Sequence, residues 1–513
     1  MATPYITKVY LLDVPLENDY KNSLYFTSKA NQQAYFESNI VKSYTDFSYQ
    51  RKDKLIKIPD IYDNIAHCNY VMYQNSNYSN KWFYAFIDKM EYINDGTTYV
   101  YIETDVIQTW LFDYDVKSSF VEREHVDNDT TGLHTVPENV ELGEYTSNGF
   151  ERDNELTDLG YMIQVTENVA GDNKFYATLF GGIANVGGAY YTDNWQVAVS
   201  IIQAYQDGRE DAIINVYVIP KRLIPDESLS GSLYTGSSSP VTYTKSINKV
   251  TTIDGYTPRN NKLLTFPYNF LVLDNNNGSS NVLQYELFST SNCQFEIAGV
   301  PTVGGSIKCV PLNYKGHSRY QQEGLMCGKF PTCGWVNDTY TNWLTQNAVN
   351  IGIGTVTSAL QLIGGIGLMA TGVGAGVGAG SALSGAMGIA NSLGQVYQHS
   401  ILPNSASGNT NGGDINACYN MNKFYFIKMS IKQEYAKIID KYFDMFGYKV
   451  NMVKVPNKAH RSRWWYTKTI DVNIDGAIPN EDMQKIKNAY NNGITFWRNA
   501  SEIDNYSLSN GIV

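Results

Sequence analysis

Few residues in this chain are grouped in a way that could support metal binding or redox chemistry. The closest cysteine pair is Cys327 and Cys333, which could form a disulfide bond or one half of a zinc site. No second pair of ligands follows at zinc-site spacing, and no CxxC motif occurs among the six cysteines. We therefore interpret the cysteines as ordinary buried thiols and expect no metal ion and no cofactor.

Phosphate-binding loops and nucleophile–base pairs are also missing from the sequence. Residues 324–329 approach a P-loop, but one residue of spacing is lacking and Phe330 stands where Ser or Thr would bind magnesium. The six histidines are dispersed singly and no HExxH motif occurs. Residues 122–125, Glu-Arg-Glu-His, point alternately to opposite faces of a strand, so we interpret them as ion-pairing residues at a sheet edge. The sequence therefore predicts that the protein is not an enzyme.

The most unusual residue pattern is apolar. Between Asp338 and Asp414 there is no Asp, Glu, Lys or Arg, which leaves residues 339–413 uncharged in a chain that is 17% charged. The centre of this segment is long enough for two spans of about 20 residues, and it carries no charge to desolvate in a bilayer. We predict a membrane-active loop whose apolar side chains are Ile351, Leu360, Leu362, Ile363, Ile366, Leu368, Met369, Val373, Val377, Leu383, Met387 and Ile389.

Glycines in the same segment favour helix contact in lipid. Gly372, Gly376 and Gly380 recur every four residues, the small-xxx-small spacing that lets helices approach closely. The flanks carry no Lys or Arg, so the charge signal of a permanent anchor is missing. A permanent anchor, an inert glycine-rich loop and a stored, releasable loop remain open. We favour the releasable loop, because its flexible polar flanks suit a segment that leaves a folded body and returns to it.

Outside this segment the sequence predicts a mainly β fold with some helix. Residues 81–86 and 98–103 alternate apolar and polar positions around Asp95-Gly96, which predicts a β-hairpin with Gly96 at positive φ. In the second arm we expect Val100, Ile102 and Val106 to share the buried face.

Two helices are predicted near the C-terminus. Helical spacing marks residues 431–446 before Gly447 and residues 481–490 before Gly493. In the first helix the apolar face is predicted to contain Ile431, Tyr435, Ile438, Tyr442 and Phe446.

Four segments are therefore expected along the chain. Residues 1–154 form an N-terminal β-rich domain, residues 155–338 a second β-rich domain, residues 339–417 the charge-free Gly/Ala-rich loop, and residues 418–513 a C-terminal α+β segment that packs back on the first part.

The charge distribution limits the partners. A net charge of −11 argues against tight DNA binding by the whole surface. Residues 423–468 nevertheless hold eleven Lys or Arg against three acids, which fits either a DNA- or headgroup-facing surface or a solvated helix face. The N-terminus lacks a basic region followed by an apolar stretch, so we expect synthesis in the cytosol.

Well-separated blocks of the sequence are similar to a known family. They are residues 18–22, 26–28, 31–32, 80–86, 96–100, 108–110 and 123–126, and near the C-terminus residues 492–495, Trp497 and residues 505–507. These blocks and the apolar segment occur in the same order as in that family and cover about half of the chain. The family that they resemble is the tail knob (distal tail tube) proteins of small short-tailed Bacillus phages of the picovirus type.

This resemblance implies a structural virion protein at the distal end of a short tail, assembled in the cytoplasm of the host bacterium. Six copies would form a β-rich tube through which double-stranded DNA leaves, while the apolar loops plug the lumen and later penetrate the host membrane. The implied partners are the other copies of the homohexamer, an upstream tail or lower collar protein, a tail-tip protein, the DNA in the lumen and the host cell membrane. Two alternatives are a stand-alone pore-forming protein and a cell-wall hydrolase on a β scaffold.

Overall fold

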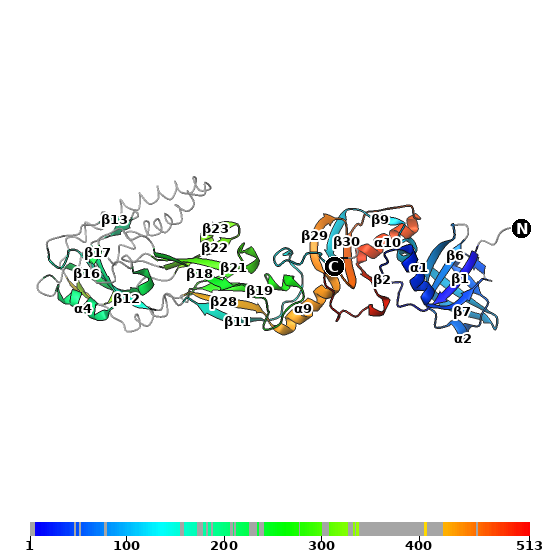
Figure 1. The fold of residues 1–513 in the computed structure, drawn as a ribbon, viewed down its shortest axis with the longest axis horizontal. Coiled ribbons are helices and arrows are strands. Elements are labelled where there is room, and N and C mark those ends of the chain that lie inside the picture. The colour runs from blue at the N-terminus through cyan, green and yellow to red at the C-terminus, as the bar shows by residue number, and fades with distance from the viewer. Residues whose placement is uncertain are drawn as a thin grey trace. The chain divides into compact units, whose positions relative to one another are not determined.

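The fold consists of two compact units. Unit 1 contains residues 1–143, 256–263 and 433–513, and unit 2 contains residues 144–255 and 264–432, so the chain passes between the units four times. The computed structural model describes residues 6–45, 48–50, 53–75, 79–153, 158–171, 178–180, 183–185, 188–205, 209, 212–224, 233–234, 241–275, 278–299, 307–326, 332–333, 335–337, 405–407, 424–457 and 460–513. Figure 1 labels the helices and strands.

Unit 1 begins with an antiparallel sheet of seven strands that is buried on both faces. One face packs around Val9, Ile56 and Val100, and the other packs around Phe36 and Tyr84. The strand order is β3 (Ile40–Tyr44), β1 (Ile6–Leu12), β6 (Tyr70–Asn75), β7 (Lys81–Asn94), β8 (Thr97–Thr104), β5 (Leu55–Ile58) and β4 (Ser48–Gln50).

The predicted β-hairpin is confirmed as β7 and β8, but its turn differs from the prediction. Gly96 is not at positive φ. The side chain of Asn94 accepts the Gly96 N–H at 2.9 Å, and the register shifts between Tyr92 and Asn94. The strand also ends earlier than predicted. Val106 is the first residue of a helix, for which the buried Asp105 is the N-cap.

A second sheet of unit 1 joins distant parts of the chain. Its order is β2 (Asn22–Leu24), β32 (Ile494–Trp497), β30 (Trp464–Ile470), β10 (Ser119–Glu124) and β29 (Tyr448–Lys454), with β2 parallel to β32. A pair of short strands, β9 (Tyr114–Val116) and β31 (Ile474–Gly476), lies in the same unit. The helices are α1 (Lys29–Ser38), α2 (Tyr62–Ile65), α3 (Val106–Trp110), α9 (Gln433–Phe446) and α10 (Asn480–Asn492), with a 3-10 turn at Ala500–Glu502 and another at Asn261–Leu264, the last residue of which belongs to unit 2.

Both predicted C-terminal helices are confirmed, as α9 and α10, but the predicted apolar face of α9 is wrong at two residues. Ile431 lies in β28, before the helix, and the side chain of Ile438 is 67% exposed. Ala436, Ile439, Asp440 and Phe443 are buried instead, and the carboxylate of Asp440 accepts hydrogen bonds there.

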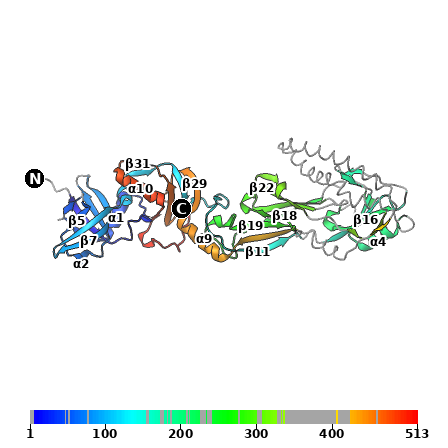
Figure 2. The same cartoon turned by 180° about the vertical axis from the view of Figure 1, so that it is seen from behind.

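Unit 2 contains a sandwich of two antiparallel sheets, which lie on opposite sides of a shared core in Figure 1 and Figure 2. The rings of Phe295 and Phe426, one from each sheet, lie 4.7 Å apart. The first sheet is β11 (Tyr145–Arg152), β28 (Tyr425–Ile431), β19 (Asn269–Asp274) and β20 (Ser280–Leu283). The second is β18 (Val241–Asn248), β21 (Asn292–Gly299), β22 (Ile307–Tyr314) and β23 (His317–Arg319), with β24 (Leu325–Met326) also paired to β22.

A further antiparallel sheet of unit 2 is covered by helix α4 (Trp195–Gln203). Its order is β17 (Leu233–Tyr234), β15 (Gly188–Thr192), β12 (Leu159–Val165), β16 (Ile213–Pro220) and β25 (Thr332–Cys333). Short 3-10 turns occupy Lys221–Leu223, Tyr285–Leu287 and Gln321–Glu323, and β13 (Thr178–Phe180) pairs with β14 (Ile183–Asn185). The prediction of a mainly β fold is confirmed.

Candidate functional site

The two ends of the charge-free segment lie side by side. Strand β26 (Trp335–Asn337) pairs antiparallel with β27 (Ser405–Ser407), with Trp335 opposite Ser407 and Asn337 opposite Ser405. Just before β26, strand β25 pairs with β16 at Cys333 and Val216. The chain therefore enters and leaves residues 338–404 at neighbouring strands, next to a sheet of unit 2.

The residues predicted to act on a membrane lie outside the described residues. This applies to all of Ile351, Leu360, Leu362, Ile363, Ile366, Leu368, Met369, Val373, Val377, Leu383, Met387 and Ile389, and to Gly372, Gly376 and Gly380. No helix in the described ranges combines the length and the apolar character needed to span a bilayer.

Possible ligand side chains in the described part of the chain are dispersed. No three His, Cys, Asp or Glu side chains gather there as a metal-binding group. For Cys68, Cys293 and Cys309 the prediction of buried thiols is confirmed.

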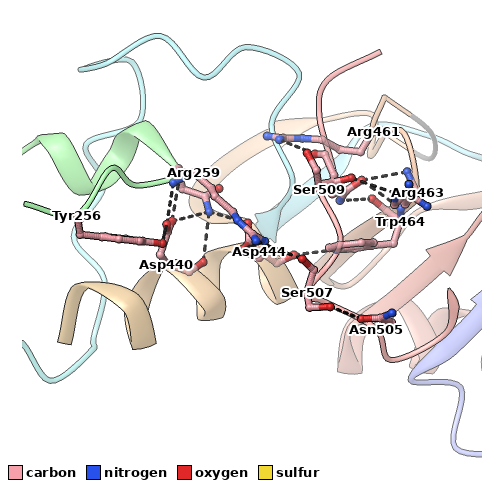
Figure 3. A network of polar contacts seen from close by, with 12 residues as sticks. Tyr256, Arg259, Asp440, Asp444, Arg461, Arg463, Trp464, Asn505, Ser507 and Ser509 are labelled. Atoms are coloured by element: carbon pink, nitrogen blue, oxygen red, sulfur yellow. Dashed lines mark hydrogen bonds and ion pairs between the residues drawn. The ribbon is translucent and has the colours of Figure 1, made fainter. Parts of the chain in front are cut away.

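A buried carboxylate on α9 lies at the centre of a polar network of unit 1, which Figure 3 shows. Asp440 is 1% exposed. Its Oδ2 accepts hydrogen bonds from the Tyr256 hydroxyl and the Arg259 backbone N–H, both at 2.7 Å. Its Oδ1 accepts from the Asn260 backbone N–H at 3.1 Å and from Asn260 Nδ2 at 2.8 Å. One side chain therefore fixes three residues of the segment 256–263.

Asp444, one helical turn later, extends this network. Its carboxylate accepts from Asn260 Nδ2 at 2.9 Å and from Arg259 Nη1 at 3.2 Å, and burial raises its pKa. Its backbone carbonyl accepts from Trp464 Nε1 at 2.8 Å and bonds His125 Nε2 at 3.0 Å. The end of α9 thus connects segment 256–263 to β30 and to the end of β10.

A second buried carboxylate holds the same segment from another side. The side chain of Glu138 is fully buried, and it accepts from Lys262 Nζ at 2.5 Å, from the Lys449 N–H at 2.8 Å and from the Arg123 guanidinium. Burial lowers the pKa of Lys262, although Glu138 opposes that shift. Asn261 binds Asp129 through its backbone N–H at 3.0 Å.

The interpretation of residues 122–125 as ion-pairing is confirmed, but their predicted place at a sheet edge is wrong. Strand β10 lies between β29 and β30, so Arg123, Glu124 and His125 are buried. Glu124 pairs with Lys454. His125 accepts the Tyr466 N–H at 2.7 Å through Nδ1, and burial lowers the pKa of His125 to about 3.

Part of the positive charge of the basic stretch 423–468 is paired with acids. Five of its Lys or Arg side chains pair with acids that lie elsewhere in the sequence. These pairs are Lys428–Glu151, Lys432–Glu144, Lys454–Glu124, Arg463–Glu502 and Lys468–Glu122.

These clusters hold the chain in place. The carboxylates of Asp440 and Glu138 are each surrounded by donors, which satisfy the hydrogen-bonding capacity of their oxygens. The sequence analysis missed both residues. One signal was available for Asp440, since a charged residue within a helical stripe of buried positions requires several partners.

The sequence matches family models of phage tail proteins. Residues 6–115 match the family model of the caudoviral major tail protein N-terminus, and this range contains the seven-stranded sheet. This match indicates the class, the tail proteins of tailed phages, for the first part of the chain.

The rest of the chain narrows that class. Residues 235–511, more than half of the chain, match the C-terminal domain of tail knob protein gp9 of Bacillus phage phi29. The gp9 tail knob proteins of Bacillus phages PZA and phi29 are each 26% identical to this chain over 588 residues, covering 98% of this chain and 97% of each relative. The structure of the bacteriophage C1 tail knob protein, gp12, has a similar fold, with a TM-score of 0.67 and 16% identity over 99% of this chain and all of that one. This chain belongs to the phage tail knob protein family and is a structural component of the virion tail.

Proposed function

We propose that this protein is the distal tail tube through which the phage genome is ejected, working as a homohexamer. Membership of the tail knob family supports a structural role at the tail. Six copies would carry a net formal charge of −66, six times the −11 of one chain. A lumen of the same sign as DNA would repel the phosphates and let the duplex slide.

We further propose that the charge-free segment is stored in the lumen and then penetrates the host cytoplasmic membrane. The observation that carries this proposal is the absence of charge from residues 339–413, together with the β26–β27 pairing at the base of the loop. Storage is needed because six exposed apolar loops would aggregate virions. Insertion is favourable because no ion is desolvated and Gly372, Gly376 and Gly380 allow close helix packing.

The test replaces residues 348–399 by a Gly/Ser linker of the same length. The matched linker leaves the β26–β27 base and the length of the loop unchanged, so only the apolar content is lost. Assembly is followed by class averages in electron microscopy, and membrane activity by dye release from liposomes. We expect both proteins to form rings. Only the protein with the native segment should show a closed lumen and release dye from liposomes. Intact rings that never release dye under any trigger, including low pH, would show that the segment is a structural plug alone.

A further inference from the structure

The sandwich of unit 2 has two outer faces of opposite character. On the second sheet, Thr242, Thr244 and Ser246 are exposed on β18, and the cross-strand partner of Thr244 is Glu296, which pairs with Arg319. This is the polar outer face expected for a sheet with one side in water.

The first sheet does not follow that rule. Its inner side chains, including Phe426 and Leu271, are fully buried in the core. Most of the alternate side chains that point outward are apolar, although Ser147, opposite Met429, is polar and exposed. Together with Phe266, which precedes β19, these apolar residues form what we call the apolar face, and it consists of Tyr145, Phe150, Phe266, Phe270, Val272, Val282, Ile427 and Met429.

These residues form a continuous surface. One row crosses all four strands, because Phe150 lies opposite Ile427, Ile427 opposite Val272, and Val272 opposite Val282. At its ends Phe150 is 59% exposed and Val282 is 49% exposed.

Aromatic contacts extend the face beyond this row. The ring of Phe270 lies 5.4 Å from that of Tyr145 and 5.9 Å from that of Phe266. Tyr145 and Phe266 are 42% and 40% exposed.

The size of the apolar face fits part of a protein interface. Only one row of the face crosses all four strands, and eight residues on strands about 4.8 Å apart cover on the order of 300 Å², the size of the largest apolar patch of a typical monomer. A standard interface buries about 800 Å² on each partner. The apolar face therefore supplies about a third of one side, as the dry centre of an interface whose rim is polar. Arg152 and Asp274 lie on either side of Tyr425, in the row of residues next to the apolar face.

The lack of charge on the apolar face indicates which kind of partner binds it. None of the eight residues is basic, so the face offers nothing to DNA phosphates or to anionic headgroups. Copies of this chain carry −11 each and repel one another through most of their surface. An uncharged face is where such copies can approach at least cost, and Arg152 with Asp274 gives the rim both signs.

We propose that the apolar face is the surface through which each copy of this chain binds a neighbouring copy. The inference rests on the proposed homo-oligomeric tube and names its contact. A pair joined only here would bury about 600 Å² in total, the size of a crystal contact. Closing a ring gives every copy two neighbours, so the contact becomes stable only in the closed assembly.

The test compares two double variants of the full chain that add the same charge. F150D/V282D places two carboxylates on the apolar face, and the control T244D/S246D places two on the polar outer face of the same sandwich. All four side chains are exposed, so folding should be preserved, as checked by thermal melting. By mass photometry we expect F150D/V282D to need at least ten times the protein concentration to assemble, and the control to assemble like the native chain. Equal assembly of both variants would overturn the proposal.

A measurement on the native chain covers the case in which F150D/V282D fails to fold. Met429 lies on the apolar face, and Met326, which is 40% exposed, lies on β24 of the same unit. Peroxide should oxidise Met429 more slowly in assembled than in dissociated protein, with Met326 unchanged. Rings in which Met429 stays reactive would overturn the inference and leave the proposed tube standing. A native chain that forms no ring would overturn both, and F150D/V282D rings that fail only to join virion tails would assign the face to another tail protein.

Discussion

Replacing Asp440 by Asn should release the segment 256–263 from unit 1. The carboxylate accepts four hydrogen bonds, two at each oxygen, and hydrogen bonds to a charged group contribute about 1.5–3 kcal/mol each. An Asn side chain keeps one acceptor oxygen and turns a donor NH₂ toward the Tyr256 hydroxyl and the Arg259 N–H. Two of the four bonds are then lost or reversed, so we expect a destabilisation of about 3–4 kcal/mol.

Hydrogen exchange on the native protein measures this effect locally, which matters because a chain of two units need not unfold in one step. If opening of the segment becomes about 3 kcal/mol easier, amides of residues 256–263 and of α9 should exchange roughly 100-fold faster. Amides of the β7–β8 hairpin should not change.

The matched control is Asp475→Asn, because Asp475 is 78% exposed and its nearest cation, Lys117 Nζ, lies 3.8 Å away. An exposed pair of this kind contributes about 0–1 kcal/mol, so little change is expected. Unchanged exchange in Asp440→Asn, or equal acceleration in both variants, would refute the assigned role of Asp440.

Three further outcomes are expected from unit 1. Because the pKa of His125 is about 3 in the fold and about 6.5 when unfolded, the unfolded chain takes up the proton first, and stability should fall as pH decreases from 6.5 toward 3. Thermal melting against pH should show a flatter profile for His125→Gln. Gly447→Ala should lower the free energy of unfolding by more than about 2 kcal/mol, since φ is +64° and a Cβ would meet the Glu124 carbonyl. The control Gly511→Ala adds a Cβ in open space, so this variant should melt like the native chain. Phe36→Ala should cost about 3–5 kcal/mol in denaturant unfolding, because the ring is fully buried.

Local patterns predicted the elements well where neighbouring residues decide the structure. The β7–β8 hairpin follows from alternation around Asp95-Gly96, and α10 ends at Gly493, whose φ is +97°. The errors arose where distant residues decide. Ile438 fits the helical apolar spacing of α9, yet Asp440 faces inward because its donors come from residues 256–260, about 180 positions away.

In the candidate site too, one feature could be predicted from local sequence and another could not. The charge-free segment is visible in the sequence because absence of charge is a property of composition alone. The Glu138 cluster is not visible there, since Arg123, Lys262 and Lys449 come from three separate parts of the chain. No local pattern brings such residues together. The division of the chain into four domains remains a prediction. Residues 256–263 pack with unit 1, and no spacing rule in the sequence indicates this.

The β26–β27 pairing has a consequence for how this chain can evolve. Once the two strands meet, the conformational entropy lost in closing the loop depends only on the logarithm of its length, and doubling that length costs about 0.6 kcal/mol. Residues 338–404 can therefore gain or lose whole stretches while the sheet that ends at β25 keeps its register. The fold leaves selection free to change the length of this segment without redesigning the body that carries it.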